Sequence, residues 1–420
     1  MKITYIFHKL ELLILGTLIL FLGVVLCARN IKTYVSEHYA VESYSLIRGH
    51  FDLIIRRREL YLDTLVIDNK VYFAGDPGTA WFLLPLAAIS ALNDQVPPQW
   101  PINLLAVATI AISVNQILKR QEINKTTDRI WLIICFVFAT PLVSVIYIPN
   151  TWNIAQTVGI AITLVYLSEW LGKKRGVLLL PLILLAGFTR KQLLLPITIF
   201  SVLDLILSGK PLHLLHKQKQ KHIWLSLALV LIFSTFSYKA YEKWYYHYFA
   251  IPIGLGASTA AYNLPLHQQL LKEYGQFNLF YLPKNIYYYF LKGPEPVVQS
   301  DAIGSNLKWP FITASADGIG FFFLSPIFML LFLGQIKFNK SQLPAAIASL
   351  TLGCLYLTFF TTGSDQFGLR YSADIIPFLF LLLLPHFKGG VSSNVKFLIT
   401  MSSLFNAYLL IAFYASGRAI

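Results

Sequence analysis

The sequence contains few charged residues and very few cysteines for its length. Of its 420 residues, 13% are charged and three are cysteine, whereas 56% are hydrophobic. This composition, with a mean hydropathy of +0.60, is typical of a membrane protein with several spans. Cys27, Cys135 and Cys354 lie far apart in apolar runs, which predicts small buried side chains. Their spacing indicates neither a disulfide framework nor a metal site.

Apolar runs make up most of the chain, and most of them approach the ~20 residues that a bilayer requires. They predict eleven membrane helices, at 10–28, 101–118, 130–148, 153–171, 176–188, 192–208, 223–241, 319–335, 343–360, 371–385 and 395–415. Thr189-Arg190-Lys191 separates the fifth run from the sixth, so these two form either a hairpin or one broken helix.

Acidic residues are scarcer than basic ones, 20 against 34. The bases do not gather into a stripe for nucleic acid, and we expect no nucleic-acid partner. If the short apolar run 81–92 does not cross the membrane, 17 bases and only five acids fall on one face. Membrane proteins keep such an excess of Lys and Arg on the cytoplasmic side. We therefore expect 81–92 to be an interfacial or re-entrant helix on the outer face.

The predicted fold is an all-α polytopic membrane protein with about 11 transmembrane helices and interfacial helices after the first span. We expect three regions. Residues 1–241 form a transmembrane module that includes an outer loop at 29–100, 242–318 form a second outer loop, and 319–420 form the last transmembrane helices. Asn103, Asn115, Gln116 and Gln156 lie within apparent spans. We expect these amides to bond one another across helices and to have no catalytic role.

The segment from Ser36 to Pro85 holds a third of the acids in the chain: Glu37, Glu42, Asp52, Glu59, Asp63, Asp68 and Asp76. Glu37, His38, Glu42 and Ser45 recur at helical spacing, so an interfacial helix would present several of them together. A carboxylate that is partly shielded from water can keep a raised pKa and act as a general base. The alternative is that these acids only solvate a surface helix.

Two short sequences in this segment predict turns. Asp68-Asn69 lies between two short extended stretches and indicates a tight hairpin turn. Asp76-Pro77-Gly78 indicates a sharp turn into the interfacial helix. Asp63 belongs to no turn dipeptide, so it is the better candidate for a functional acid.

Three motifs carry a resemblance to a known family. The first is SYSLIRGHFDL at 43–53, followed from Asp63 by D-x-x-x-x-x-N-K-x-Y-x-x-x-x-P-G-x-A-x-x-x-L-P. The second is Ala-Gly-Phe-Thr-Arg at 186–190, and the third is Phe-Gly-Leu-Arg-Tyr at 367–371 with Asp374 and Pro377. Together they resemble bacterial membrane glycosyltransferases of the GT-C fold. In that family, Pro follows the Arg of the second motif, where this chain has Lys191.

The resemblance implies an enzyme of the bacterial cytoplasmic membrane with its active site on the outer face. The donor would be a sugar linked to polyprenyl phosphate, and the acceptor a hydroxyl group of a lipid or glycan. The family commonly places an acid soon after the first span, which here is Glu37. Asp63 is the second candidate for the base, and Glu42 is a rival to both. The residues indicate no certain cofactor and leave a divalent metal open.

The resemblance also assigns substrate-binding residues. An Arg fork can hold phosphate oxygens in a bidentate manner and stays charged at any working pH. Arg190, Lys191 and Arg370 would therefore hold the lipid phosphate, although Arg190 could instead extend toward the membrane surface. The other predicted substrate-binding residues are His38, Glu42, Arg48, His50, Asp76, Asp365 and Tyr371. A lipid transporter or flippase is the alternative function, but no matched pair of broken segments supports it.

Overall fold

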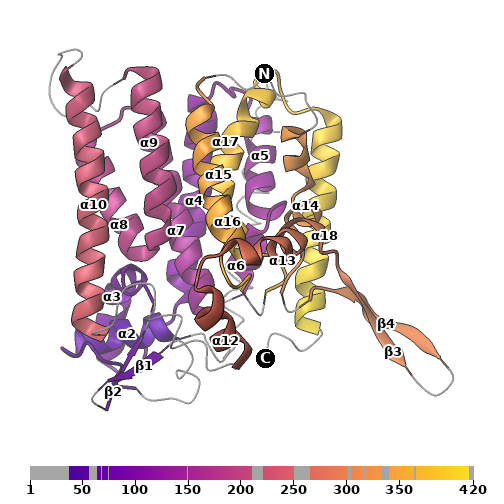
Figure 1. Ribbon diagram of the computed structural model, residues 1–420. Coiled ribbons are helices and arrows are strands. Elements are labelled where there is room, and N and C mark those ends of the chain that lie inside the picture. Colours follow the sequence, from indigo (N-terminus) through magenta and orange to yellow (C-terminus); the bar gives the residue numbers. More distant parts are fainter. Residues whose placement is uncertain are drawn as a thin grey trace.

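The computed structural model describes residues 37–55, 64–67, 69–73, 75–148, 150–210, 221–249, 265–300, 304–315, 317–332, 340–363 and 366–415. The chain is mostly helical, at 70%, and its helices form a bundle with one small sheet at one end and a second that projects from its side (Figure 1). Asp63, Asp365 and the first predicted span lie outside the described residues.

The helices of the first half are α2 His38–Ile47, α3 Gly78–Ala91, α4 Trp100–Arg120, α5 Thr126–Phe138, α6 Leu142–Tyr147, α7 Thr151–Leu171, α8 Gly176–Thr189, η2 Lys191–Leu193, α9 Leu194–Ser208 and α10 Lys221–Phe249. Those of the second half are α12 Pro265–Tyr274, η3 Leu279–Tyr281, α13 Leu282–Ile286, η4 Tyr287–Leu291, α14 Phe321–Leu324, η5 Pro326–Leu331, α15 Leu343–Leu357, α16 Arg370–Ala373, α17 Ile376–Leu383, η6 Leu384–Phe387 and α18 Ser393–Ala415. The strands are β1 Thr64–Ile67, β2 Lys70–Phe73, β3 Glu295–Ser300 and β4 Ser305–Thr313.

Within the described residues, five helices are long and apolar enough to cross a membrane. They are Trp100–Arg120, Thr151–Leu171, Lys191–Ser208, Ile223–Ala240 and Ser393–Ala415. Four shorter apolar helices accompany them, at Gly78–Ala91, Gly176–Thr189, Leu343–Leu357 and Ile376–Phe387. These helices indicate a membrane protein, whereas the count of about eleven spans is not confirmed.

Two of the predicted spans are interrupted by proline. The run 130–148 divides into α5 and α6 because Pro141 has no N–H and disfavours helical backbone at Thr140. The Thr140 hydroxyl donates to the Phe136 carbonyl and accepts from the Leu142 N–H, which covers groups freed by the break. The run 319–335 likewise divides into α14 and η5 at Pro326.

Helix α7 lies at the centre of the bundle. Of its most apolar 18 residues, 89% are buried, and α7 packs against α4, α8 and α6. A helix that is apolar on all sides needs such a position, because each of its faces must be covered. Cys135 is buried in this core as expected, but Cys354 on α15 is exposed, so the prediction of buried cysteines was wrong there.

Helices α8 and α9 form a hairpin that turns at Arg190. Lys174, before α8, makes an ion pair of 2.6 Å with Asp204, near the end of α9. The start of one helix therefore lies beside the end of the other. Of the two arrangements that the sequence left open, the hairpin is the one present.

The basic loops gather at one end of the bundle. Lys388 reaches Glu122 across 2.8 Å, and Lys396 lies 4.0 Å from Asp128. Loops more than 250 residues apart thus share one face, as the charge pattern predicts. That this face is cytoplasmic stays a prediction.

The opposite end carries the first polar segment, as Figure 1 shows. Strands β1 and β2 form an antiparallel hairpin with Ile67 paired to Lys70, and Asn69 takes the positive φ of 61° that a tight turn requires. Pro77 and Gly78 begin α3, which packs against α2. The predictions of a hairpin turn and of a short apolar helix after Asp76 are both confirmed.

Candidate functional site

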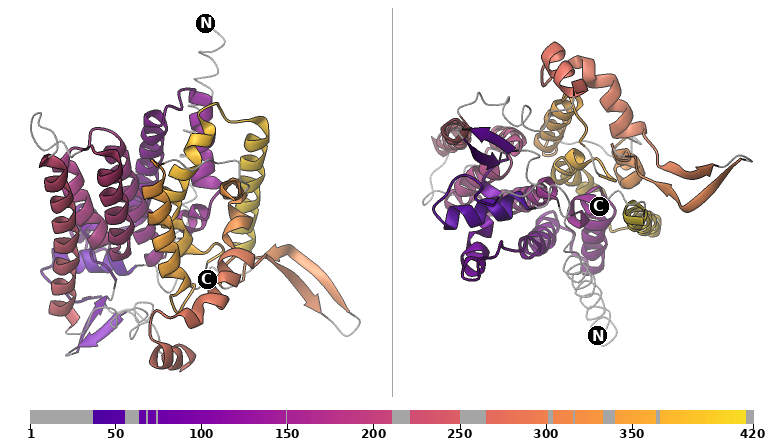
Figure 2. Two further views of the ribbon diagram at one scale, coloured as in Figure 1. Left: turned by 45° about the horizontal axis from the view of Figure 1, so that its top comes forward. Right: turned by 90° about the horizontal axis from the view of Figure 1, so that it is seen from below.

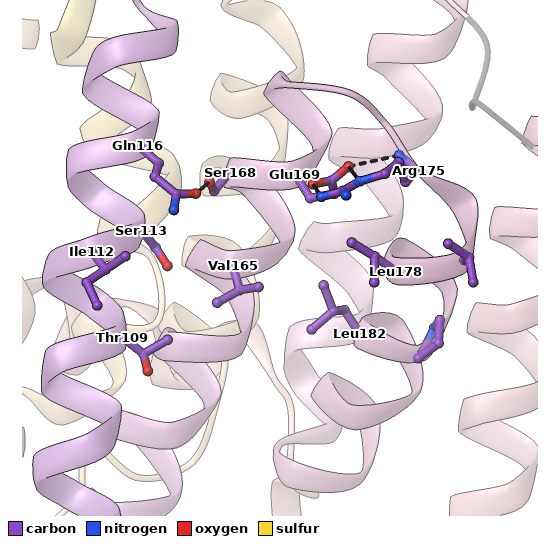
Figure 3. A pocket seen from close by; sticks show the side chains of 12 residues that line it. Thr109, Ile112, Ser113, Gln116, Val165, Ser168, Glu169, Arg175, Leu178 and Leu182 are labelled. Carbon is purple, nitrogen blue, oxygen red and sulfur yellow. Dashed lines mark hydrogen bonds and ion pairs between the residues drawn. The ribbon is translucent and has the colours of Figure 1, made fainter.

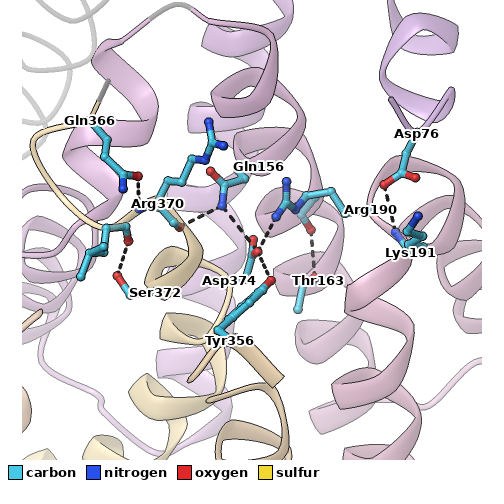
Figure 4. A network of polar contacts seen from close by, with 12 residues as sticks. Asp76, Gln156, Thr163, Arg190, Lys191, Tyr356, Gln366, Arg370, Ser372 and Asp374 are labelled. Carbon is cyan, nitrogen blue, oxygen red and sulfur yellow. Dashed lines mark hydrogen bonds and ion pairs between the residues drawn. The ribbon is translucent and has the colours of Figure 1, made fainter. Parts of the chain in front are cut away.

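The candidate site is a buried polar network centred on Asp374, shown in Figure 4. Its Oδ2 atom accepts hydrogen bonds from Arg190 Nη2 at 2.6 Å and from the Tyr356 hydroxyl at 2.5 Å. Gln156 Nε2 lies 3.5 Å from the same oxygen and 2.8 Å from the Arg370 carbonyl. The Arg190 side chain is 4% exposed and that of Asp374 is fully buried. The network therefore contains an ion pair that water does not reach.

The helix break explains the position of Arg190. Its backbone is extended, with φ −154° and ψ 97°, between the end of α8 and the start of η2. Extended backbone at this point directs the guanidinium sideways from the hairpin into the bundle, toward Asp374 at the end of α16. Arg190 therefore does not extend toward the membrane surface. Its charge is held by Asp374.

Arg370 lies in the same network but has a different environment. Its guanidinium carbon is 5.7 Å from the ring centre of Trp152 and 5.2 Å from that of Tyr371. Both rings attract a cation through their faces. Among the described residues, no carboxylate forms an ion pair with Arg370, and its Nε atom has no hydrogen-bond partner. Its guanidinium can therefore accept an anion without first releasing one.

The Gln366 side chain fixes the loop before Arg370 through hydrogen bonds to its backbone. The Arg370 N–H donates to Gln366 Oε1 at 2.9 Å, and Gln366 Nε2 donates to the Thr362 carbonyl at 2.9 Å. Gly363 has φ +95°, a conformation that favours glycine, and a Cβ atom there would lie 3.1 Å from Arg370 Nε. The sequence Thr-Thr-Gly thus leaves room for the guanidinium.

The first polar segment reaches this network through α3. The Lys191 N–H donates to Asp76 Oδ2 at 3.3 Å. Gly78 makes this approach feasible, because a Cβ atom there would lie 2.7 Å from the backbone of Phe188 and Thr189. The Trp81 and Phe188 rings pack beside it, with centres 4.9 Å apart. The Pro-Gly motif therefore joins α3 to the end of α8, next to Arg190.

Helix α2 presents its acids unequally. Glu37 is the N-cap residue just before α2 and is partly exposed, whereas Glu42 within the helix is 6% exposed. His38 is buried, with Nδ1 3.1 Å from the Thr151 hydroxyl at the start of α7. Glu42 Oε2 has no hydrogen-bond partner in the described part of the chain. Burial raises the pKa of Glu42 well above its usual range, and the negative charge of Asp76 raises it further.

This raised pKa predicts a pH-dependent stability. Above the ordinary pKa of Glu, the unfolded chain loses the proton that folded Glu42 keeps, so the free energy of unfolding falls as pH rises. The slope is at most about 1.4 kcal/mol per pH unit. We expect Glu42→Gln, which has no such proton, to unfold at a higher temperature than the parent protein, by a margin that grows from pH 5 to pH 8.

Thermal unfolding in detergent measures this effect, and Glu122→Gln is the matched control. The pKa of Glu122 is lowered by its hydrogen bond and ion pair with Lys388, so its stabilising effect is constant over the same interval and is lost only in acid. If the Glu42→Gln curve stayed parallel to that of the parent from pH 5 to pH 8, Glu42 would not be protonated in the folded protein.

The structure does not bring every predicted site residue to the network. Arg48 pairs with Asp94 and donates to the Ala91 carbonyl at 2.9 Å, so it connects α2 to the end of α3. His50 is largely exposed, 3.7 Å from Asp52. Tyr371 stacks on Tyr356, with ring centres 5.0 Å apart, and so lies beside the network. Asp63 and Asp365 cannot be placed, because both lie outside the described residues.

Several network residues were missed by the sequence reasoning. Gln156, Tyr356 and Trp152 were not among the candidates, and Asp374 was noted only as part of a motif.

The four amides within the spans do not bond one another, contrary to our expectation. Asn103 donates to the Ile146 carbonyl, and Asn115 accepts from Arg129. Gln116 accepts from Ser168, and Gln156 donates to the Arg370 carbonyl and to Asp374. A glutamine in the middle of an apolar helix was the signal that could have identified the site.

A pocket of about 510 Å³ lies elsewhere, between α4, α7 and α8 (Figure 3). Apolar side chains such as Val165, Leu178 and Leu182 line it, and the Glu169–Arg175 ion pair of 2.8 Å closes one side. Arg175 belongs to the basic end of the bundle, so the pocket is distant from Arg370. We place the candidate site at the network, because that is where the buried charges and motif residues meet.

No three His, Cys, Asp or Glu side chains form a metal-binding group among the described residues. Gln156 Oε1, Arg370 Nε and Asp374 Oδ1 are buried there without hydrogen-bond partners, an arrangement suited to a polar ligand. Comparison with known proteins adds no identity: no protein-family model, no curated protein and no solved structure matches this chain.

Proposed function

We propose that this protein is a membrane glycosyltransferase that moves a sugar from a polyprenyl-phosphate donor to an acceptor hydroxyl. One observation carries the proposal: the three motif segments that resemble GT-C enzymes meet in one place. Asp76 accepts a hydrogen bond from the Lys191 N–H. Arg190 forms an ion pair with Asp374, and Arg370 lies within the same network. These segments are up to about 300 residues apart in the sequence, so nothing in their spacing requires them to meet.

The two arginines would have different roles. Arg190 is paired with Asp374 and would position the loop that carries Arg370. Arg370 has no carboxylate partner among the described residues, and its fork suits the phosphate of the donor. Trp152 and Tyr371 pack against its guanidinium and would hold it in place when the anion leaves.

The proposed reaction is an inverting displacement. A carboxylate removes the proton of the acceptor hydroxyl as its oxygen bonds the anomeric carbon of the sugar. The bond from that carbon to the phosphate oxygen breaks, and polyprenyl phosphate leaves with its negative charge near Arg370. Glu37 and Asp63 remain the candidates for the base. Glu42 is less suited, because a carboxyl that keeps its proton cannot accept another.

The test is transfer of a labelled sugar from a polyprenyl-phosphate donor by the purified protein in liposomes. We expect the label to move to an added lipid or glycan acceptor, with release of polyprenyl phosphate. The sugar and the acceptor are tested as panels. We expect the reaction at the outer face of the bacterial cytoplasmic membrane. Movement of the lipid between leaflets without any transfer of sugar would instead identify a flippase.

Arg370→Lys tests the phosphate site directly. The substitution keeps a positive charge but loses the planar fork, so donor binding should weaken by about 1–3 kcal/mol, the scale of charge-assisted hydrogen bonds. Donor affinity in detergent is the measurement. Arg48→Lys, which alters an exposed arginine outside the network, is the control. Unchanged donor affinity in Arg370→Lys would remove Arg370 from the phosphate site.

A further inference from the structure

A two-stranded hairpin projects sideways from the helices, on the half of the bundle opposite the basic loops (Figures 1 and 2). It consists of β3 and β4, which pair with each other and with no other strand of the described chain. Its base contacts the bundle where β4 meets α18. A hairpin of two strands is marginally stable in water by itself, so it normally needs a surface to cover one face.

The hairpin has an apolar face. Val298 lies directly opposite Leu307, so their side chains share one side of the ladder. Trp309 follows two residues later, and its ring contacts that of Phe311, with centres 5.8 Å apart. These four side chains are exposed by 49% for Val298, 62% for Leu307, 55% for Trp309 and 49% for Phe311. Toward the tip the residues become polar, with Gln299, Ser300, Ser305 and Asn306.

The contact with α18 sets the level of the hairpin. The Tyr408 hydroxyl donates to the Pro310 carbonyl, and the Trp309 and Tyr408 rings lie 6.3 Å apart. Tyr408 is seven residues before the last residue of α18, which corresponds to about 10 Å of helix. Helix α18 is long enough to span the membrane, so the base of the hairpin lies beside the C-terminal part of this candidate span.

We propose that the apolar face of the β3–β4 hairpin lies on the outer surface of the membrane and anchors this end of the protein in the lipid. Leu404, in the middle of α18, and Ile411, near its end, are both exposed, so the apolar face adjoins the lipid-facing surface of a candidate span. Tryptophan is enriched at the level of lipid headgroups. Lys308, exposed on the alternate side of β4, would face water or phosphate.

The open edges of the hairpin limit its depth. Each strand has one edge without a strand partner in the described sheet, and such backbone groups cannot enter hydrocarbon without a large cost. The headgroup region supplies water to the edges and acyl chains to Leu307 and Trp309. A second copy of the chain, or another protein, could also cover this face, and the experiment below separates these cases.

The experiment follows the fluorescence of Trp309 in the full chain, reconstituted in vesicles. The chain has eight tryptophans, so the emission of Trp309 is obtained as the difference between the parent protein and Trp309→Phe. We expect the emission of Trp309 to be blue-shifted and insensitive to aqueous iodide. It should be quenched in vesicles whose lipids are brominated near the carbonyl end of the acyl chain. Trp224→Phe is the matched control, because Trp224 is 73% exposed on the candidate span α10.

Two results would overturn the proposal. Quenching of Trp309 by iodide and not by bromolipid would place the hairpin in water, and resistance to both would mean that protein covers the face. Leu307→Glu gives a second reading that does not depend on the Phe variant. In that protein the total emission should shift to the red and gain iodide quenching, and an unchanged spectrum would also contradict a lipid contact.

Discussion

Replacing Asp374 with Asn is expected to lower the free energy of unfolding by about 3–5 kcal/mol, the usual effect of removing one partner from a buried ion pair. The reason is the guanidinium that remains. Arg190 is 4% exposed, and without Asp374 its charge would stay buried with no paired carboxylate. The Tyr356 hydroxyl would also lose its charged acceptor. The effect therefore comes from the uncompensated cation and not from the loss of one hydrogen bond.

The double variant Arg190→Met, Asp374→Asn separates these causes. It leaves no buried charge at this position, so most of the lost stability should return, although the pair itself is absent. Glu122→Gln, which breaks the exposed pair with Lys388, should lower the free energy of unfolding far less than Asp374→Asn. Unfolding in detergent by heat or denaturant is the measurement. An Asp374→Asn protein as stable as the parent would mean that Asp76 or water compensates Arg190.

Features fixed by local chemistry could be predicted from the sequence. Asn69 turns the β1–β2 hairpin because its short polar side chain tolerates positive φ, and Pro77-Gly78 begins α3. The hairpin of α8 and α9 was one of two arrangements that the polar interruption at Arg190 allowed. In each case the deciding residues lie within a few positions of the feature that they determine.

The broken spans show where hydropathy is a poor guide. The run 130–148 is apolar throughout, so it reads as one helix, yet Pro141 ends α5 and α6 begins after it. A hydropathy pattern records which residues avoid water and not whether their backbone can stay helical. The same reasoning applies at Pro326, where α14 ends after one turn.

The site could be predicted only in part. The motifs indicated Arg190, Arg370 and Asp76, but not that Arg190 would be paired with Asp374, which lies 184 residues away. Such pairing depends on how α8 and α16 pack around α7, and sequence spacing does not contain that information. Burial could not be predicted either: Glu37 caps the short helix α2 and Glu42 lies within it, but only Glu42 is enclosed.

The burial of Glu42 sharpens the search for the general base. A base must be unprotonated at the working pH. Burial and the negative charge of Asp76 raise the pKa of Glu42, which favours its protonated form. Glu37 is partly exposed one turn earlier, and Asp63 belongs to the same polar segment of the sequence. We therefore expect the base to be Glu37 or Asp63, and the substitution of Glu42 to have little effect on the chemical step.

Either Glu37→Gln or Asp63→Asn is expected to reduce sugar transfer by about 10²–10⁴-fold, the usual contribution of a general base, while donor binding persists. Both substitutions keep the size of the side chain and remove only the basic oxygen, so the protein should still fold. Glu42→Gln, on the helix that Glu37 caps, is the matched control and should transfer sugar at close to the parent rate. Initial rates of transfer in liposomes, with donor affinity measured in parallel, give the result. Parent-like transfer by both Glu37→Gln and Asp63→Asn would exclude both acids as the base, and a loss confined to Glu42→Gln would show that this buried carboxyl gives up its proton during the reaction.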